Sequence, residues 1–342
     1  MFSFANDYSE GACPIVLKAL VATNDEQTPG YGLDKYCFRA ADKIKALIGN
    51  KNADVHFITG GTPCNIIVIS MLKSYEAVIC VESGHINTHE TGGPEATGHK
   101  ILAVKGKDGK ITPEEIEQVV LTHTDEHVVK PKLVFVSDST ELGTIYTKEE
   151  LTAISAMCKK HNLYLYLDGA RIGCALMANG NDLTLKDIAE LVDIFYIGGT
   201  KNGLLMGEAM IILNDELKPN FRHYIKQHCA MLAKGRTIGV QFLAVFQDDT
   251  YFINAKNADV MAQALANVFK HFNIPMFMES PTNQVFPILE NSVLEKIKEK
   301  YIVTEWGKYD EDHTTVRFCC SWATKKTDIE NFYRDLALIM KG

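Results

Sequence analysis

The segment that decides the fold begins Leu163-Tyr-Leu-Tyr-Leu-Asp168-Gly-Ala-Arg171 and ends Asp193-Ile-Phe-Tyr-Ile-Gly198-Gly-Thr-Lys201. Each stretch is an apolar and aromatic run of strand length that leads into a turn of small residues followed by a charged side chain. The spacing from Asp168 to Lys201 is that of one strand–helix–strand unit, which places both side chains at the same edge of neighbouring parallel strands. We therefore expect an α/β fold with Asp168 and Lys201 side by side.

The same alternation extends over residues 50–215. Strands are expected at 55–58, 77–81, 132–136, 163–167, 193–197 and 209–213, with helices at 65–72 and at 149–161, the latter capped by Thr147. Beyond residue 250 the pattern predicts helices at 258–271, 292–300 and 328–340 and strands at 284–287 and 315–320. These patterns predict a large α/β domain over residues 1–250, including the N-terminal segment, and a small α+β domain over residues 251–342.

Charge, cysteine usage and hydropathy argue against several classes of protein. The 342 residues carry a formal net charge of −8 without a basic stripe, which argues against a nucleic-acid partner. The nine cysteines form no Cys-x-x-Cys pair, so neither a disulfide framework nor a zinc module fits. No apolar run reaches the roughly 20 residues that cross a bilayer, and no leader-like segment opens the chain. We expect a cytoplasmic protein that binds no membrane.

The pair of Asp168 and Lys201 suits pyridoxal phosphate. This cofactor needs a lysine amine for its imine and a carboxylate that keeps its pyridine nitrogen protonated. Taken singly, Asp168 is typical of a turn cap and Lys201 of a solvated surface charge, so the interpretation depends on the pair. A metal site would call for His or Cys beside the aspartate, and we expect none.

Two further elements follow predicted strands. Gly60-Gly61-Thr62 precedes a helix start, where backbone amides and the Thr62 hydroxyl favour a phosphate. His85 follows another strand and is placed to face the cofactor or the substrate. The spacing of His85 and His89 also resembles half a metal site, but no further ligand accompanies it.

Together these motifs resemble the threonine aldolases, which belong to the β-eliminating lyases of the aspartate-aminotransferase fold type. The resemblance runs nearly end to end and includes Tyr31-Gly-Leu-Asp34, Gly61-Thr62, Asp168-Gly-Ala-Arg171 and Thr200-Lys201. It implies a large domain with a mostly parallel seven-stranded sheet, a small C-terminal domain, and active sites at the interface of a homodimer or homotetramer.

The resemblance also implies residue roles. Gly61 and Thr62 would bind phosphate, His85 would stack on the cofactor ring, and Asp168, Arg171, Thr200 and Lys201 would complete the cofactor site. His127 matches a family histidine near the substrate hydroxyl, and Asn6 and Arg317 would bind substrate. Lys234 and Arg236 resemble residues that reach a neighbouring subunit's cofactor, although a solvated basic turn fits equally well.

The expected reaction is aldol cleavage of threonine, allo-threonine or a related β-hydroxy-α-amino acid to glycine and an aldehyde, with His85 or His127 as the base. Departures from the family pattern at Asn6-Asp7, Gly60, Asp138-Ser139-Thr140 and Asn202-Gly203 indicate a divergent branch. The alternatives are another pyridoxal-phosphate reaction, such as β-elimination, racemisation or transamination, and a non-catalytic α/β protein.

Overall fold

A central sheet of seven strands organises the larger part of the computed structural model, which describes residues 1–341. The strand order is β2-β8-β7-β6-β5-β3-β4. The strands are β2 (Asp54–Ile58), β3 (Glu76–Val81), β4 (Lys100–Val104), β5 (Lys130–Ser137), β6 (Tyr164–Asp168), β7 (Ile194–Gly198) and β8 (Glu208–Ile212). Only β8 runs antiparallel to its neighbours, so the mostly parallel seven-stranded sheet is confirmed.

Helices cover both faces of this sheet because its strands are apolar on both sides. Along β6, Leu165 and Leu167 pack into one core while Tyr166 packs into the other. The first core includes α1 (Pro14–Ala22), α2 (Lys35–Leu47), α6 (Pro113–Thr122), α7 (Lys148–Lys160), α8 (Ile172–Met177), α9 (Leu185–Leu191) and α11 (Arg236–Val245). The second includes α3 (Gly61–Ser70), α4 (His85–Thr88) and α10 (Phe221–Gln227), and α5 (Gly93–Ala96) packs on α3.

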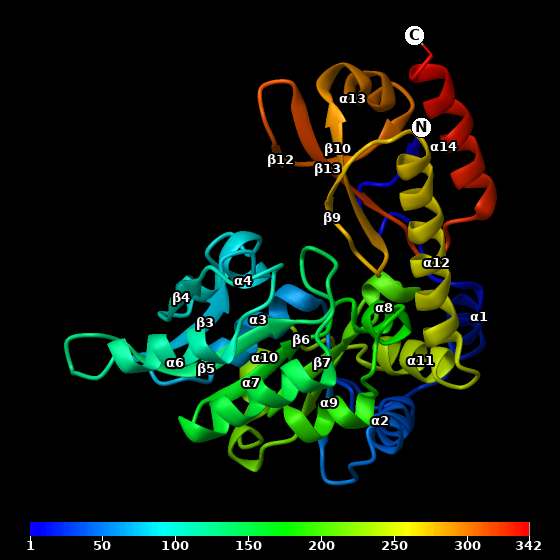
Figure 1. Cartoon of the computed structure of the whole chain (residues 1–342). Helices are drawn as coiled ribbons and strands as arrows, with labels where there is room; N and C mark the ends of the chain where they lie inside the picture. The colour runs from blue at the N-terminus through cyan, green and yellow to red at the C-terminus, as the bar shows by residue number, and fades with distance from the viewer. Residues whose placement is uncertain (342) are drawn as a thin grey trace.

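The C-terminal part has its own antiparallel sheet and its own core. Its strands, in the order β12-β13-β10-β9, are β9 (Met276–Met278), β10 (Gln284–Glu290), β12 (Thr304–Lys308) and β13 (His313–Cys319). The helices are α12 (Thr250–His271), α13 (Asn291–Lys298) and α14 (Lys326–Ile339). Helix α12 extends from the large sheet alongside the C-terminal part (Figure 1).

The N-terminal residues lie with this C-terminal part, where the N-terminus is close to α14 (Figure 1). Strand β1 (Phe2–Ser3) pairs in parallel with β11 (Tyr301–Ile302), and Phe4 is buried in the C-terminal core. This placement differs from the expectation that the N-terminal segment belongs to the large domain. A domain boundary near residue 250 stays a prediction, although α11 and α12 meet in a short turn there.

Element bounds follow the sequence pattern closely at the centre of the fold and less closely at its edges. All six predicted strands of the large sheet are present, and the Thr147 hydroxyl caps α7 by accepting from the backbone N–H of Glu150. Strands β4 and β12 were not predicted because they are half-exposed edge strands with weak apolar alternation. Among residues 1–341, no helix is long and apolar enough to cross a bilayer.

Two glycines bring the ends of β6 and β7 together. The backbone N–H of Gly198 donates to the carbonyl of Gly169 at 3.0 Å. A Cβ on Gly169 would lie 1.9 Å from the Tyr196 carbonyl oxygen, and a Cβ on Gly198 would lie 2.3 Å from that of Ala170. Only glycine fits this approach, which fixes the turns that carry Asp168 and Lys201.

Candidate active site

A pocket of about 350 Å³ opens at the carboxyl ends of the parallel strands, where ligands bind in open α/β sheets. It lies at the edge that also holds the start of the antiparallel strand β8. The pocket brings together seven of the residues singled out from the sequence: Gly61, Thr62, His85, Asp168, Arg171, Thr200 and Lys201.

Asp168 is a buried carboxylate at the end of β6 with a fixed orientation. Its Oδ1 accepts from the Tyr196 hydroxyl at 2.5 Å and from the backbone N–H of Ala170 at 3.0 Å. Its Oδ2 accepts from Asn65 Nδ2 at 3.1 Å. Three donors hold a buried negative charge in place, which suits a carboxylate that pairs with a cationic ring nitrogen.

Lys201 lies in a single 3₁₀ turn (η1, Thr200–Asn202) directly after β7. Burial and the charge of Arg171 lower the pKa of its amine, and the carboxylates of Asp7 and Asp168 partly oppose that effect. A lysine with a lowered pKa is a better nucleophile at neutral pH because more of it is unprotonated. The turn is held by Glu208, whose Oε2 accepts from the backbone N–H of Gly199 at 2.7 Å.

The start of α3 offers a cradle for an anion. The helix has ten residues and begins at Gly61, after Gly60 at its N-cap, and no side chain caps it. Gly61 packs under the Tyr196 hydroxyl, which a Cβ would approach to 3.0 Å. Thr59, Gly60, Gly61 and Thr62 all line the pocket, so the free amides of the first turn face the same space as Lys201.

His85 is tied to a buried carboxylate. Its Nδ1 lies 2.6 Å from Glu90 Oε1, which also accepts from Asn65 Nδ2 at 2.9 Å. Burial alone would lower the pKa of His85, but the hydrogen bond to Glu90 and the charges of Asp168 and Glu90 raise it. Because Nδ1 donates to Glu90, proton exchange with a ligand falls to Nε2.

Glu141 anchors the other end of the same network. Its Oε1 accepts from the backbone N–H of His85 at 2.9 Å and from the Ser137 hydroxyl at 2.8 Å. Burial, together with the nearby charge of Asp168, raises the pKa of this carboxyl. Glu141 therefore positions the start of α4.

Two buried polar atoms of the pocket lining have no hydrogen-bond partner in the described part of the chain, which indicates that the pocket suits a polar ligand. Ser139 Oγ and Glu141 Oε2 are buried and have no hydrogen-bond partner among residues 1–341, and both residues line the pocket. A buried unpaired polar atom costs free energy unless a ligand supplies its partner. The pocket thus offers the groups that pyridoxal phosphate requires. These are the Lys201 amine, the Asp168 carboxylate as an acceptor for the pyridine N–H, and the free amides at the start of α3 for the phosphate.

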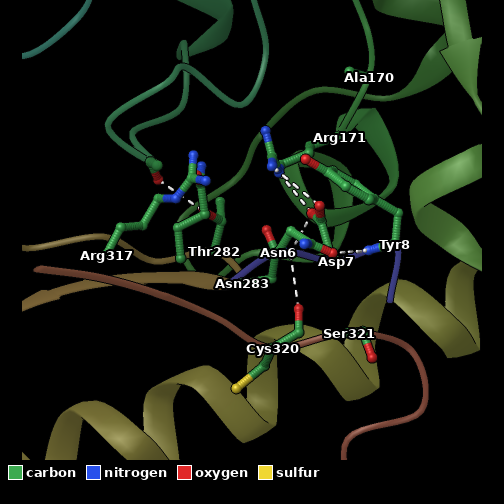
Figure 2. A network of polar contacts seen from close by, with 12 residues as sticks. Asn6, Asp7, Tyr8, Ala170, Arg171, Thr282, Asn283, Arg317, Cys320 and Ser321 are labelled. Atoms are coloured by element: carbon green, nitrogen blue, oxygen red, sulfur yellow. Dashed lines mark hydrogen bonds and ion pairs between the residues drawn. The ribbon is translucent and has the colours of Figure 1, made fainter. Parts of the chain in front are cut away.

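The N-terminal segment contributes Tyr8 to the pocket and places Asp7 against Arg171 (Figure 2). Buried Asp7 accepts from Arg171 Nε at 2.7 Å and Nη2 at 3.1 Å, and from Asn283 Nδ2 at 2.9 Å. Arg171, one of the residues expected in the cofactor site, lines the pocket and pairs with Asp7. Asn6 lies beside this pair and its Oδ1 accepts from the Tyr8 backbone N–H at 3.0 Å, so it shapes the turn that places Tyr8 in the pocket.

Arg317 comes from β13 of the C-terminal part and lies close to Asn6 and Thr282 (Figure 2). Its Nη2 makes one long hydrogen bond of 3.4 Å to the carbonyl of Ala5, and its Nε is buried without a partner. Among residues 1–341 it forms no ion pair. Arg317 is therefore a cation near the pocket whose guanidinium N–H groups are mostly free to bind a ligand.

The structure does not bring His127 to this pocket. His127 is exposed on the loop before β5, at the amino end of a strand whose carboxyl end forms the site. A role for His127 near the substrate hydroxyl therefore stays a prediction, and within one chain it has no support from the pocket. Within one chain, His85 is the histidine in the pocket.

Arg236 has a partner inside its own chain. Its Nη1 donates to the Thr23 carbonyl at 2.6 Å and its Nη2 to the Asn24 carbonyl at 3.0 Å. Lys234 lines the same hollow beside the 23–30 loop, away from the pocket that holds Lys201. Contact of either residue with another subunit's cofactor stays a prediction.

Sequence reasoning missed the residues that orient the chemical groups. Asn65 links Glu90 to Asp168 and accepts from the Tyr166 hydroxyl at 2.7 Å. An amide on an otherwise apolar helix was the available signal. Asp7, Glu141 and Tyr196 carried no comparable signal, because their partners lie far away in the sequence.

Comparisons with known proteins agree with this geometry. The family model described as Beta-eliminating lyase matches residues 6–292. A low-specificity L-threonine aldolase of a Pseudomonas species is 32% identical over 99% of this chain and 98% of its own length. The solved structure of Leishmania major threonine aldolase is 45% identical, covers 99% of this chain and 100% of its own, and superimposes with a TM-score of 0.98. A putative L-allo-threonine aldolase of Listeria monocytogenes, 19% identical with a TM-score of 0.77, shares the fold.

Proposed function

Because the chain belongs to the threonine aldolase family of β-eliminating lyases, we propose that it cleaves threonine, allo-threonine or a related β-hydroxy-α-amino acid to glycine and an aldehyde. The observation that carries the proposal is the convergence of Lys201, Asp168 and His85 in one pocket. The enzyme is a pyridoxal-phosphate-dependent lyase, in which Lys201 would hold the cofactor aldehyde, Asp168 its pyridine nitrogen and the start of α3 its phosphate.

When bound there, pyridoxal phosphate supplies a protonated ring that accepts the electron pair left on Cα after bond cleavage. Side chains of the protein determine which bond to Cα is cleaved. Arg317 binds the substrate carboxylate through its free donors and so orients the Cα–Cβ bond. Asn6, in the adjoining N-terminal segment, is the second residue that we place at the substrate (Figure 2).

His85 moves the proton of the β-hydroxyl. The Glu90 carboxylate fixes the imidazole and stabilises its protonated form, as a carboxylate does beside a catalytic histidine elsewhere. In its unprotonated form, Nε2 of His85 accepts the hydroxyl proton while the aldehyde leaves. Glycine forms when Cα takes up one proton, which balances the proton that His85 accepted. The lowered pKa of Lys201 favours the neutral amine that would bond to the cofactor again.

A second copy of the chain completes the site. Met206 lines the pocket and is 39% exposed, and Leu205 beside it is 44% exposed. Exposed apolar side chains at a pocket rim are typical of an interface. A homodimer or homotetramer is therefore expected, and light scattering coupled to gel filtration measures it. The nine free thiols suit the reducing cytoplasm.

Product analysis tests the reaction. The purified holoenzyme is incubated separately with L-threonine and L-allo-threonine, and acetaldehyde, glycine, ammonia, keto acid and the D-amino acid are each measured. Aldol cleavage predicts acetaldehyde and glycine in equal amounts. Ammonia with a keto acid would indicate β-elimination and the D-amino acid would indicate racemisation, and either as the main product would overturn the proposal.

A further inference from the structure

Trp306 interrupts the regular pairing of β12 with β13. Glu305 pairs with Val316 and Gly307 pairs with Thr315, which leaves Trp306 as one extra residue on its strand. Such a β-bulge bends the strand and re-aims a side chain, and bulges are common beside active sites. The indole is thereby directed at its neighbour on β13, with the Arg317 guanidinium carbon 5.1 Å from its ring centroid.

Arg317 has little else to hold it. Its one hydrogen bond, to the Ala5 carbonyl, is 3.4 Å long, and its buried Nε has no partner among residues 1–341. A flexible arginine without a carboxylate partner loses rotamer entropy when it must hold one orientation. The indole face offers an attraction that fixes the guanidinium plane without consuming any of its N–H donors.

We propose that Trp306 is a positioning residue that holds the Arg317 guanidinium ready for the carboxylate of the amino-acid substrate. The inference rests on the proposed function, since it assumes that Arg317 binds that carboxylate. It goes beyond that function because it makes the affinity for the substrate carboxylate depend on Trp306, a residue that contacts neither Lys201 nor the bond that is cleaved.

The indole is itself braced from both parts of the chain. Phe286 of β10 packs edge-on against it, with ring centroids 5.5 Å apart. From the large sheet, the His89 ring lies 6.1 Å away, and His89 in turn is 5.5 Å from His85. Partial burial and the charges of His85 and Arg317 lower the pKa of His89, which disfavours a second positive charge beside the indole.

The test compares two small ligands that differ in the carboxylate. Glycine carries the group and methylamine lacks it, and binding of each to the holoenzyme is followed by the change in cofactor absorbance. The variants are Trp306→Ala, Trp306→Phe and Arg317→Ala, with Trp322→Phe as the control at the only other tryptophan. Cofactor affinity is measured for each variant as a check on the rest of the site.

Trp306→Ala is expected to weaken glycine binding about tenfold and to leave methylamine and cofactor binding unchanged, and Trp306→Phe is expected to retain most of the glycine affinity. Trp322→Phe is expected to bind both ligands normally. In Trp322→Phe, glycine is further expected to change the tryptophan emission, which then comes from Trp306 alone, whereas methylamine is not.

Two results would overturn the inference while leaving the proposed function intact. One is normal glycine binding in Trp306→Ala when Arg317→Ala has lost it. The other is an equal loss of glycine and methylamine binding, which a merely structural role would produce. Normal glycine binding in Arg317→Ala would instead show that the carboxylate is bound elsewhere, and the substrate role of Arg317 and the inference would fail together.

Discussion

Replacing Asp7 by Asn removes one partner of the buried ion pair that holds the N-terminal segment across the site. Burial alone would raise the pKa of Asp7, but the charges of Arg171 and Lys201 and the hydrogen bonds from Arg171 and Asn283 lower it from 3.8 to about 2. A shift of nearly two pH units corresponds to about 2.5 kcal/mol, and leaving Arg171 buried without a counter-charge costs about 3 kcal/mol or more. We therefore expect Asp7→Asn to destabilise the fold by about 3 kcal/mol.

Urea unfolding of the wild type and Asp7→Asn measures this loss. Because the folded state lowers the pKa of Asp7, the wild-type advantage should be complete above about pH 4 and should disappear as the pH falls towards about 2. Asp215→Asn is the matched control. The Asp215 side chain is 89% exposed and pairs with Lys218, so removing its charge should change the free energy of unfolding by less than about 0.5 kcal/mol. An Asp7→Asn variant as stable as this control would refute the reasoning.

Substitutions at three further positions examine the site. In Glu90→Gln the carboxylate that raises the pKa of His85 is gone, so the acidic limb of kcat/KM should move to lower pH by about one unit; an unmoved limb would exclude His85 as the base. His127→Ala should keep kcat/KM within about twofold of the wild type, because His127 lies outside the pocket of its own chain; a loss of about a hundredfold, the usual effect of removing a proton-transfer group, would instead place His127 in the site of a neighbouring subunit. Glu141→Gln should retain most activity because its amide oxygen can still accept from the His85 backbone N–H, whereas Glu141→Ala should lose about tenfold by leaving that N–H unpaired; equal losses in steady-state assays would show that this hydrogen bond is not what Glu141 contributes.

Local patterns were enough to predict the centre of the fold. The strands that end at Asp168 and Gly198 are buried on both faces, so they are continuous apolar runs that stand out in the sequence. The turns that follow them carry the chemically distinctive residues, which is why Asp168 and Lys201 could be paired before their geometry was known. Edge strands such as β12 lack that signal, so the bulge at Trp306 was also missed.

Long-range partners could not be predicted in the same way. Asp7 meets Arg171 across 164 positions of sequence, and Asn65 meets Asp168 across 103. No local propensity encodes such a contact, because it depends on how two elements pack. His127 shows the limit of a local match, because its loop lies at the amino end of β5 in this chain and the role predicted for it stays untested.

The central claim, that Lys201 carries pyridoxal phosphate as an imine, is tested most directly by trapping that bond. The absorbance of the purified protein is recorded before and after borohydride reduction, and the modified peptide is located by mass. The account predicts a visible cofactor band that disappears on reduction and a single modified residue, Lys201, with no modification in Lys201→Ala. A protein that takes up no cofactor on reconstitution, or a label on another lysine, would contradict it.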